Sequence, residues 1–583
     1  MRRDSRCFQK IPLFPVEITM NCDEKINAAH TALQQGDYQR SEQLYREVLQ
    51  KEPENLCALD GLGILLCQHG ETEKGIDLFH KALCLLQQAR RPNPQWEASI
   101  LLHLGLSYRT LGLRQEALQV FTEAAILTPH EFDLLLNLGQ VYFELEQYVH
   151  AAEQFRTLTA IQPDNASAWL TLGFILSNLD QHHEAAEALR TAEFLDPTSP
   201  EACLYLAESL RKAERYEESL PHYQRMLQVG AEYPQAVHSY GKSLLALGNL
   251  EQGWDAMEFR FAGSFGTWER HHLPNWTPES DVSHVLAYSE EGIGADLMFA
   301  SCLPNLINNV DHCVIECEAS LHSLFRRSFP RADFVPLADD YVRPDGNPWN
   351  IPLDAQIALG SLPRYFRRSI DDFPLQKTYL VPDKDQVVRW HTRLASLGDG
   401  KKIGILWQGT WTDETRKQTS LPLQELRSLM ARHQGAAWIG LQHGSTQNDL
   451  NQRGSFGISP RIFPEAFQYN LDAMAALLTA LDLVITPPGY TAHLAGALGI
   501  RTWLLVPEGA DWRHSIDCVS EPRSVWHPSI KMYRQAKGQT WQHFFATLEN
   551  DLEKFLTTYR PPEEMPVTLN FPERTTIAIP KAA

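Results

Sequence analysis

Two short runs of residues combine glycine with side chains that can bind a phosphate or move a proton. Glu290–Gly294 reads Glu-Glu-Gly-Ile-Gly, and Gly489–His493 reads Gly-Tyr-Thr-Ala-His. Each run lies between an apolar stretch and an expected helix, where free backbone N–H groups and the helix dipole favour an anion. The Thr491 hydroxyl and the His493 imidazole add further polar groups to the second run. Either run alone is a weak signal, because any strand-to-helix turn offers free N–H groups.

The elements that would position these runs alternate between short apolar strands and helices. The first series has expected strands at 284–289, 313–317 and 332–335, with helices at 296–308 and 320–328. The second has expected strands at 403–407, 437–441, 483–485, 502–506 and 530–533, with helices at 423–432, 471–480, 490–498 and 541–557. This order is typical of parallel sheets with helices on both faces. We therefore expect two α/β lobes, with ligands at the carboxyl ends of their strands.

The first half of the chain is a repeat array, because small residues recur every 34 positions at Gly105, Gly139, Gly173, Ala207 and Gly241. Large residues recur in the same register at Phe121, Phe155, Leu189, Tyr223 and Met257, and three units close with proline at Pro129, Pro163 and Pro197. Two earlier units fit with an insertion around 90–95. The pattern resembles the tetratricopeptide repeat, with seven units over residues 22–265. It predicts an α-solenoid whose concave face binds a protein or peptide; the alternative is a structural spacer.

Charge and composition exclude several classes of protein. The 52 basic and 72 acidic residues give a net charge of −20, of which −14 lies in residues 1–265. This balance argues against a general binder of nucleic acid or of anionic membranes. No apolar run approaches the length of a membrane span, and the ten cysteines include no Cys-x-x-Cys pair, so we expect a cytoplasmic protein. His312, Cys313 and Cys317 lie close together, but an apolar stretch between the cysteines indicates a buried strand rather than a metal site.

The second half resembles bacterial glycosyltransferases of the GT-B type, close to the heptosyltransferase family, family 9. The resemblance covers about residues 254–557. The matching stretches are Glu290–Gly294, Ile403–Gly409, Ser420–Leu423, Leu481–Ile485, Ala492–Gly499 and Asp511–Arg513. The resemblance implies a fold of two Rossmann-like lobes, a nucleotide-sugar donor in the C-terminal lobe and an acceptor facing the N-terminal lobe. The chain is also similar to soluble flagellin glycosyltransferases, which implies a protein acceptor delivered by the repeats.

These expectations divide the chain into five segments. They are a flexible N-terminal segment (1–21), the repeat solenoid (22–265), the N-terminal lobe (266–385), the C-terminal nucleotide-binding lobe (386–560) and a tail (561–583). The stretch Trp254–Phe261 is expected either to dock on the lobes or to be a plain capping helix. Neither alternative makes it a reactive site.

Several polar positions depart from the family pattern. The family usually has Asp directly after its Gly-x-Gly, where this chain has Ala295, so Asp296 and Glu291 are the candidate catalytic residues. The family's Asp-Thr or Asp-Ser is replaced by Pro488-Gly489, and its Arg before Ser420 by Thr419. The candidates for binding the nucleotide-sugar are Gly292, Gly294, Gln408, Gly409, Lys417, Gly489, Tyr490, Thr491, His493 and Arg513.

Sugar transfer needs a base for the acceptor hydroxyl, positive groups for the leaving phosphate and exclusion of water. Basic side chains and helix N-termini can serve the phosphate, so we expect no metal and no cofactor, with the nucleotide-sugar as substrate. The altered polar positions leave a second hypothesis open. In it, the GT-B-like domain only binds, and the protein is a scaffold whose repeats hold a partner.

Overall fold

The computed structural model describes residues 22–88, 93–228, 233–262, 273–337, 351–375, 378–409, 420–442, 460–467, 471–508, 511–518, 521–536 and 538–559. Contacts between residues divide the chain into two compact units, Met1–Leu210 and Arg211–Ala583. The division falls before residue 265, where the repeat pattern ends in the sequence. The last repeats therefore belong with the α/β lobes. Each unit is described by itself.

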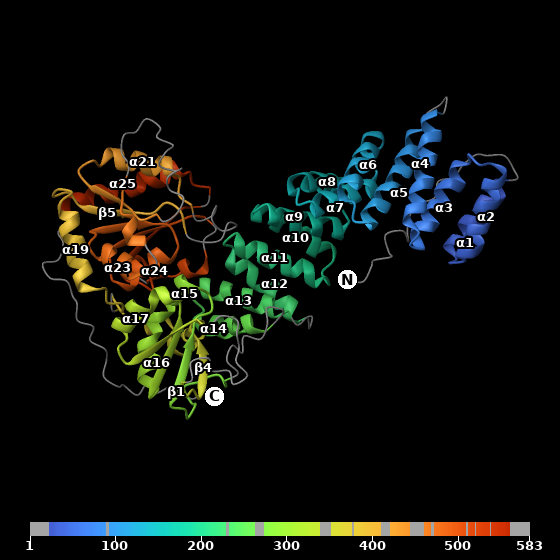
Figure 1. The fold of residues 1–583 in the computed structure, drawn as a ribbon. Coiled ribbons are helices and arrows are strands. Elements are labelled where there is room, and N and C mark those ends of the chain that lie inside the picture. Colours follow the sequence, from blue (N-terminus) through green and yellow to red (C-terminus); the bar gives the residue numbers. More distant parts are fainter. Residues whose placement is uncertain are drawn as a thin grey trace. The chain divides into compact units, whose positions relative to one another are not determined.

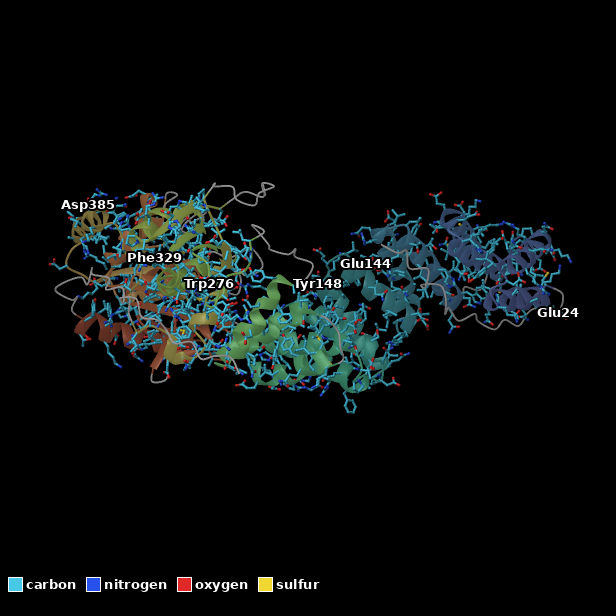
Figure 2. All side chains as sticks on the ribbon, turned by 90° about the horizontal axis from the view of Figure 1, so that it is seen from below. Glu24, Glu144, Tyr148, Trp276, Phe329 and Asp385 are labelled. Carbon is cyan, nitrogen blue, oxygen red and sulfur yellow. The ribbon has the colours of Figure 1, made fainter. Side chains whose placement is uncertain are left out.

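The first unit consists of antiparallel helix pairs (Figure 1). The first helices of the pairs are α1 (Asp23–Gln34), α3 (Leu56–Gln68), α5 (Pro94–Thr110), α7 (Phe132–Glu144), α9 (Ala166–Asn178) and α11 (Pro200–Lys212). The second helices are α2 (Tyr38–Lys51), α4 (Thr72–Gln88), α6 (Arg114–Leu127), α8 (Tyr148–Ile161) and α10 (His182–Leu195). Acidic side chains such as Glu24 and Glu144 lie along these helices (Figure 2). The predicted solenoid of helix pairs is confirmed.

The 34-residue spacing has a direct steric cause. A Cβ atom built at Gly105 would lie 2.3 Å from the Phe121 ring, and one at Gly173 would lie 2.3 Å from Leu189. The small residue on each first helix thus makes room for the large residue on its partner. The helices on either side of the insertion in the sequence are longer than their neighbours. Helices α4 and α5 have 17 residues each, whereas α3 and α6 have 13 and 14.

The second unit begins with α12 (Tyr216–Gln228), α13 (Pro234–Ala246), α14 (Leu250–Met257) and the 3-10 turn η2 (Glu258–Phe261). The N-terminal lobe has a parallel sheet in the order β3-β2-β1-β4. Its strands are β1 (His284–Tyr288), β2 (His312–Cys317), β3 (Ala332–Pro336) and β4 (Ala355–Ala358). Its helices are α15 (Ile293–Phe299), α16 (Leu303–Asn309), α17 (His322–Ser328) and α18 (Pro363–Phe366).

The C-terminal lobe has an eight-stranded sheet in the order β10-β11-β12-β9-β8-β5-β6-β7, antiparallel only at β10 and β11. The strands are β5 (Lys402–Ile405), β6 (Ala437–Gly440), β7 (Arg461–Ile462), β8 (Leu483–Thr486), β9 (Thr502–Val506), β10 (Asp517–Cys518), β11 (Glu521–Ser524) and β12 (Ile530–Arg534). The helices are α19 (Lys384–Ala395), α21 (Leu423–Arg432), α23 (Leu471–Thr479), α24 (Tyr490–Ala497) and α25 (Trp541–Thr558).

Two local expectations differ from the structure. The expected helix at 296–308 is two short helices, α15 and α16, separated by the 3-10 turn η3 (Ala300–Cys302). Pro304 occupies the first turn of α16, where its missing N–H is harmless, so the proline starts a new helix instead of continuing the old one. The sequence predicted no strand between 335 and 403, but the structure has β4 there, which pairs with β1. Among the described residues, no helix combines the length and hydrophobicity that crossing a bilayer requires.

Candidate functional site

The residues of the C-terminal lobe that were predicted to bind the nucleotide-sugar converge at one edge of its sheet. The chain runs from β5 outward to β6 and β7 and then returns to β8 on the other side of β5. Such a reversal of strand order opens a crevice at the carboxyl ends of the two central strands. Gln408 and Gly409 follow β5, and Gly489 follows β8. The backbone N–H of Gln408 donates to the side-chain oxygen of Gln442 at 3.0 Å, and this contact brings the end of β6 to the same edge.

The turn before α24 presents a buried hydroxyl. Gly489 caps the helix with φ 156°, a conformation that other residues rarely adopt. The Thr491 side chain is buried, and apart from a contact with the side chain of its neighbour Tyr490, its hydroxyl makes no hydrogen bond with the described residues. Trp407 Nε1, Trp512 Nε1 and Arg513 Nε are also buried without a hydrogen-bond partner among the described residues. Buried donors in proteins are normally satisfied by protein, water or a ligand, so these groups have hydrogen-bonding capacity to spare.

His493 belongs to a buried cluster of three histidines. Its Nδ1 lies 3.1 Å from Nε2 of His527, and its ring stacks on His514 with centroids 5.8 Å apart. Burial lowers the pKa of His514 to about 4 and that of His527 to about 3. Burial, with the neighbouring His527 and His514, also holds the pKa of His493 well below its usual value. The cluster is therefore neutral at pH 7, and His493 can donate or accept a hydrogen bond but not supply a positive charge.

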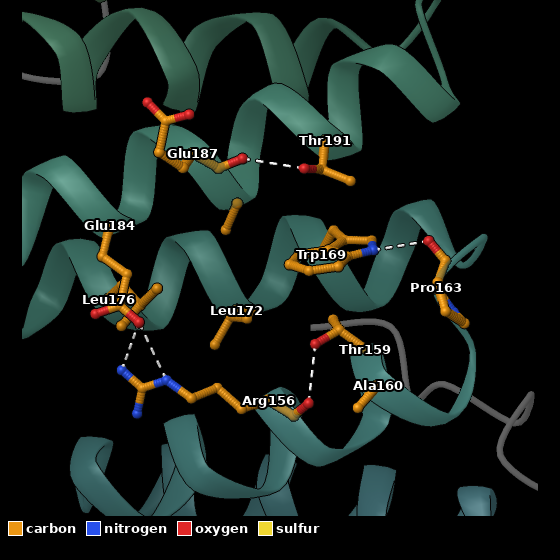
Figure 3. A pocket seen from close by; sticks show the side chains of 11 residues that line it. Arg156, Thr159, Ala160, Pro163, Trp169, Leu172, Leu176, Glu184, Glu187 and Thr191 are labelled. Atoms are coloured by element: carbon orange, nitrogen blue, oxygen red, sulfur yellow. Dashed lines mark hydrogen bonds and ion pairs between the residues drawn. The ribbon is translucent and has the colours of Figure 1, made fainter.

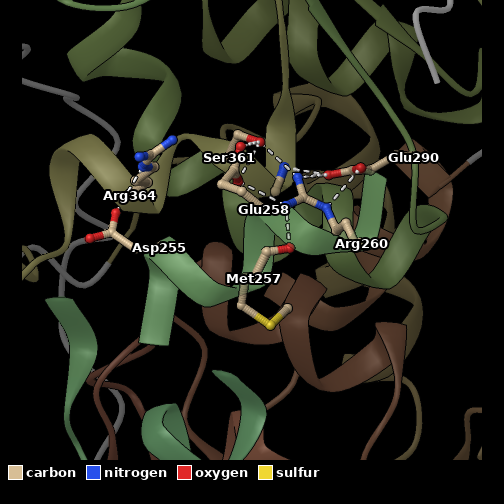
Figure 4. Close-up of polar contacts among 8 residues, drawn as sticks. Asp255, Met257, Glu258, Arg260, Glu290, Ser361 and Arg364 are labelled. Carbon is tan, nitrogen blue, oxygen red and sulfur yellow. Dashed lines mark hydrogen bonds and ion pairs between the residues drawn. The ribbon is translucent and has the colours of Figure 1, made fainter. Parts of the chain in front are cut away.

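The equivalent turn of the N-terminal lobe is held by ion pairs (Figure 4). Here the strand order reverses between β1 and β4, and Glu290 follows β1. Arg260 of η2 contacts both Glu290 oxygens at 2.7 and 3.1 Å, and the Gly360 amide donates to Glu290 at 3.1 Å. Arg260 also pairs with Glu258 at 2.8 Å. Burial raises the pKa of Glu290, and the Arg260 guanidinium opposes that rise.

Glu291, a predicted catalytic residue, is engaged in a contact between the two lobes. Its carboxylate accepts a hydrogen bond from Arg513, whose other nitrogen pairs with Asp511 at 2.9 Å. The Glu291 side chain is 25% exposed and that of Arg513 is 12% exposed, so the pair is largely shielded from solvent. Because the Arg513 guanidinium already occupies this carboxylate, the geometry favours a positioning role for Glu291.

Asp296, the other predicted catalytic residue, is buried beside the carboxyl end of β1. Its Oδ2 accepts a hydrogen bond from Ser289 at 2.6 Å. Burial raises the pKa of Asp296 to about 7, and nearby Glu290 adds to the rise while the Ser289 hydroxyl opposes it. A carboxyl group with a pKa near 7 can take and return a proton at neutral pH. Of the two predicted catalytic residues, Asp296 is therefore the better suited to proton transfer.

Two of the remaining predicted residues, Gly294 and Tyr490, lie where the lobes meet. Helices α15 and α24 pack together, and a Cβ atom at Gly294 would lie 3.7 Å from Tyr490. Gly292 caps α15 with φ 84°. Lys417 lies outside the described residues.

The sequence did not predict how extensively α14 is buried against the two lobes. Trp254 is fully buried, and its ring meets Phe299, Trp512 and Trp526 edge-on at centroid distances of 5.5 to 6.4 Å. Its Nε1 donates to the Arg367 carbonyl at 2.9 Å. Of the two alternatives for Trp254–Phe261, docking is confirmed. The apolar and aromatic residues of this stretch were the available signal, but the sequence does not show which surface they contact.

A cavity of about 340 Å³ opens beside the first lobe's sheet. Its walls come from η2, from the carboxyl ends of β1 and β4, and from α18. Trp276, Tyr288 and Tyr365 supply aromatic surface, while Glu258 and Arg364 supply charge. The mixture of flat apolar faces and polar groups suits a small ligand that has both apolar and polar surface.

A second, larger groove of about 610 Å³ lies in the repeat unit (Figure 3). The second helices α8 and α10 form its sides, and Trp169 and Leu172 of α9 lie between them. Arg156 and Glu184 pair across it at 2.8 Å. The groove thus opens between the second helices of successive repeats. That the concave face binds a protein or peptide stays a prediction.

Comparison with known proteins supports the repeat assignment. Tetratricopeptide repeat models match residues 32–95, 111–173 and 170–237, which confirms the repeats predicted from the spacing. Protein FlbA of Caulobacter vibrioides is 28% identical over 315 residues, covering 49% of this chain and 52% of the relative. The chain therefore spans about half the length of that curated relative.

Similar solved structures also match the repeats. YrrB, described as a TPR protein with an unusual peptide-binding site, is 20% identical and covers 33% of this chain and 96% of its own, with a TM-score of 0.31. A tetratricopeptide repeat protein from Parabacteroides merdae is 17% identical and covers 42% and 94%, with a TM-score of 0.30. At these scores the likeness carries no weight for the arrangement of the repeats or for function.

Proposed function

We propose that the protein is a glycosyltransferase of the GT-B type that transfers a sugar from a nucleotide-sugar to a protein acceptor. The observation that carries the proposal is the convergence of Gln408, Gly409 and Gly489–His493 at the switch point of the second sheet. In the same lobe, the buried hydroxyl of Thr491 has no partner among the described residues beyond the side chain of its neighbour Tyr490, so it has hydrogen-bonding capacity left for a donor. The tetratricopeptide repeats support a protein or peptide partner, which is the acceptor in this proposal.

In this mechanism the donor phosphates lie at the start of α24. The first N–H groups of a helix have no acceptor within the helix, and together with the Thr491 hydroxyl they stabilise charge on the leaving nucleotide. Asp296 takes the proton of the acceptor hydroxyl as that oxygen bonds to the sugar carbon. Arg513, paired with Glu291, keeps the N-terminal lobe's turn against the C-terminal lobe and so limits the entry of water.

The test is donor binding by the full chain. We expect one of the CMP-, UDP-, GDP- or ADP-sugars to raise the melting temperature, and Thr491→Val to weaken that donor about 10- to 100-fold, as for a lost hydrogen bond to a charged group. Thr547→Val on the outer helix α25 is the matched control and should bind normally. Absence of a response to all four donor classes would remove the proposal.

One observation favours a second function, that of a non-catalytic binding module. All three carboxylates near the N-terminal turn are engaged, Glu290 by Arg260, Glu291 by Arg513 and Asp296 by Ser289. Incubating the donor-bound protein with a co-expressed acceptor protein distinguishes the two functions. A mass increase of one sugar on the acceptor supports transfer, whereas binding without any mass increase supports the scaffold.

A further inference from the structure

A histidine and two glutamates converge on the outer helices of the C-terminal lobe. His433 follows the last residue of α21, and Glu549 and Glu553 stand four residues apart on α25. Residues with this spacing lie on the same face of a helix. One ligating atom from each of the three side chains lies within 4.8 Å of the others.

The histidine is the second observation that points to a ligand. Its side chain is only 9% exposed, and Nε2 is buried without a hydrogen-bond partner among the described residues. It lies 3.4 Å from Glu549 Oε1, within the distance of an ion pair but without the geometry of a hydrogen bond. A bound cation would satisfy both the imidazole nitrogen and the carboxylate. We propose that His433, Glu549 and Glu553 form a site for a divalent transition metal, with Zn²⁺ as the fitting ion.

The donor set selects the class of ion. Imidazole nitrogen with two carboxylates suits zinc and its neighbours, whereas magnesium and calcium prefer oxygen ligands alone. Zinc bonds of 2.0 to 2.2 Å in tetrahedral geometry separate neighbouring ligand atoms by roughly 3.4 Å. The distance between His433 Nε2 and Glu549 Oε1 already has this value, and a carboxylate oxygen of the exposed Glu553 lies within 4.8 Å of the ligating atoms of both residues. Water completes the coordination.

Among the described residues, Arg432 would compete with a metal ion for the Glu549 carboxylate. Its Nε contacts the same Oε1 of Glu549, but the Arg432 side chain is 50% exposed. A half-exposed ion pair contributes little, so the arginine can move into solvent when a doubly charged ion binds. Glu549 also keeps its second oxygen for coordination.

The site is structural and separate from sugar transfer. His433 lies four residues before the start of β6 and therefore near the amino ends of the strands, while the candidate nucleotide-sugar-binding residues lie at the carboxyl ends. Both helices cover one core, in which Leu429 of α21 and Leu552 of α25 are buried together. A metal ion would join the end of α21 to the middle of α25 and stabilise this layer.

Metal titration of the chelator-treated full chain tests the proposal. We expect one Zn²⁺ to bind and to raise the melting temperature, and His433→Gln and Glu553→Gln each to weaken binding about 100-fold or more. Glu553 is exposed, so its variant should fold normally. His543→Gln, an exposed histidine on α25, is the matched control. Co²⁺ bound at the site should lack a sulfur charge-transfer band, which excludes a cysteine site. Absence of stoichiometric zinc binding, or binding that both Gln variants retain, would overturn the proposal.

Discussion

The turns that start α15 and α24 occupy equivalent places in the two lobes, but their side chains are in opposite states. Each turn follows a central strand at a switch point and is capped by a glycine, Gly292 or Gly489. In the first turn, Glu290 and Glu291 are already paired with arginines. In the second, the buried Thr491 hydroxyl has no charged partner among the described residues and contacts the side chain of its neighbour Tyr490. The first turn is therefore fixed by ion pairs, whereas the second is available for the donor binding that we propose.

The largest expected effect concerns the carboxyl group that the first turn positions. Asp296→Asn cannot take a proton, so transfer should fall by about 100- to 10,000-fold while donor binding stays normal. Turnover measured by acceptor mass, with binding measured by thermal shift, checks this. Asp333→Asn, on the exposed end of a neighbouring strand, is the control. Full transfer by the Asp296→Asn variant would exclude Asp296 as the base.

Arg260→Ala should break the first turn by leaving Glu290 buried and unpaired. The free energy of unfolding should fall by about 3–5 kcal/mol, as for other buried pairs that lose one partner. Urea unfolding followed by tryptophan fluorescence measures the loss. Replacing both residues with apolar ones, Arg260→Met with Glu290→Leu, should recover most of the stability. A loss below about 1 kcal/mol, the value for an exposed pair, would show that the turn is not held in this way.

The histidine cluster beside the second turn predicts a dependence of stability on pH. The unfolded imidazoles have a pKa near 6.5, whereas the folded values for His514 and His527 are about 4 and about 3. Between pH 6.5 and 4 the unfolded state binds more protons, so stability falls as the pH falls. Each imidazole contributes up to about 1.4 kcal/mol per pH unit. His527→Phe should flatten the dependence and His543→Phe should not; equal slopes in all three proteins would contradict the assignment.

The smallest effect compares two glycines of the first turn. Gly292 has φ 84°, so Gly292→Ala should cost about 1–2 kcal/mol. A Cβ atom at Gly294 meets Tyr490 at an ordinary contact distance, and alanine favours a helix, so Gly294→Ala should be neutral or stabilising by up to about 1 kcal/mol. Urea midpoints of the two variants check the difference. Equal losses would mean that packing, and not backbone conformation, selects glycine at both positions.

Local patterns predicted much of the fold because their causes are local. The spacing of Gly105 and Phe121 reflects one contact between paired helices, and it predicted the repeats that the family models confirm. Most strands and helices of the lobes also lie close to their predicted ranges. β4 was missed because only four residues, Ala355–Ala358, form it, and its pairing partner β1 lies 70 residues away.

The site was less predictable because its contacts join distant residues. Arg513 meets Glu291 across 222 positions, and Arg260 meets Glu290 across 30. His527 joins His493 through the fold, with no signal in the spacing. Residue types can nominate a carboxylate, but only the three-dimensional structure shows whether an arginine already holds it.

The burial of Trp254 has a consequence for how the protein can vary. Since this ring lies among aromatic side chains of both lobes, the final repeat is part of the α/β unit's own interior. We therefore expect that a different repeat array can be joined ahead of this unit, in the turn between α11 and α12 near the boundary at Leu210, without removing a side chain from that interior. A chimera joined at residue 265 would lack the central tryptophan.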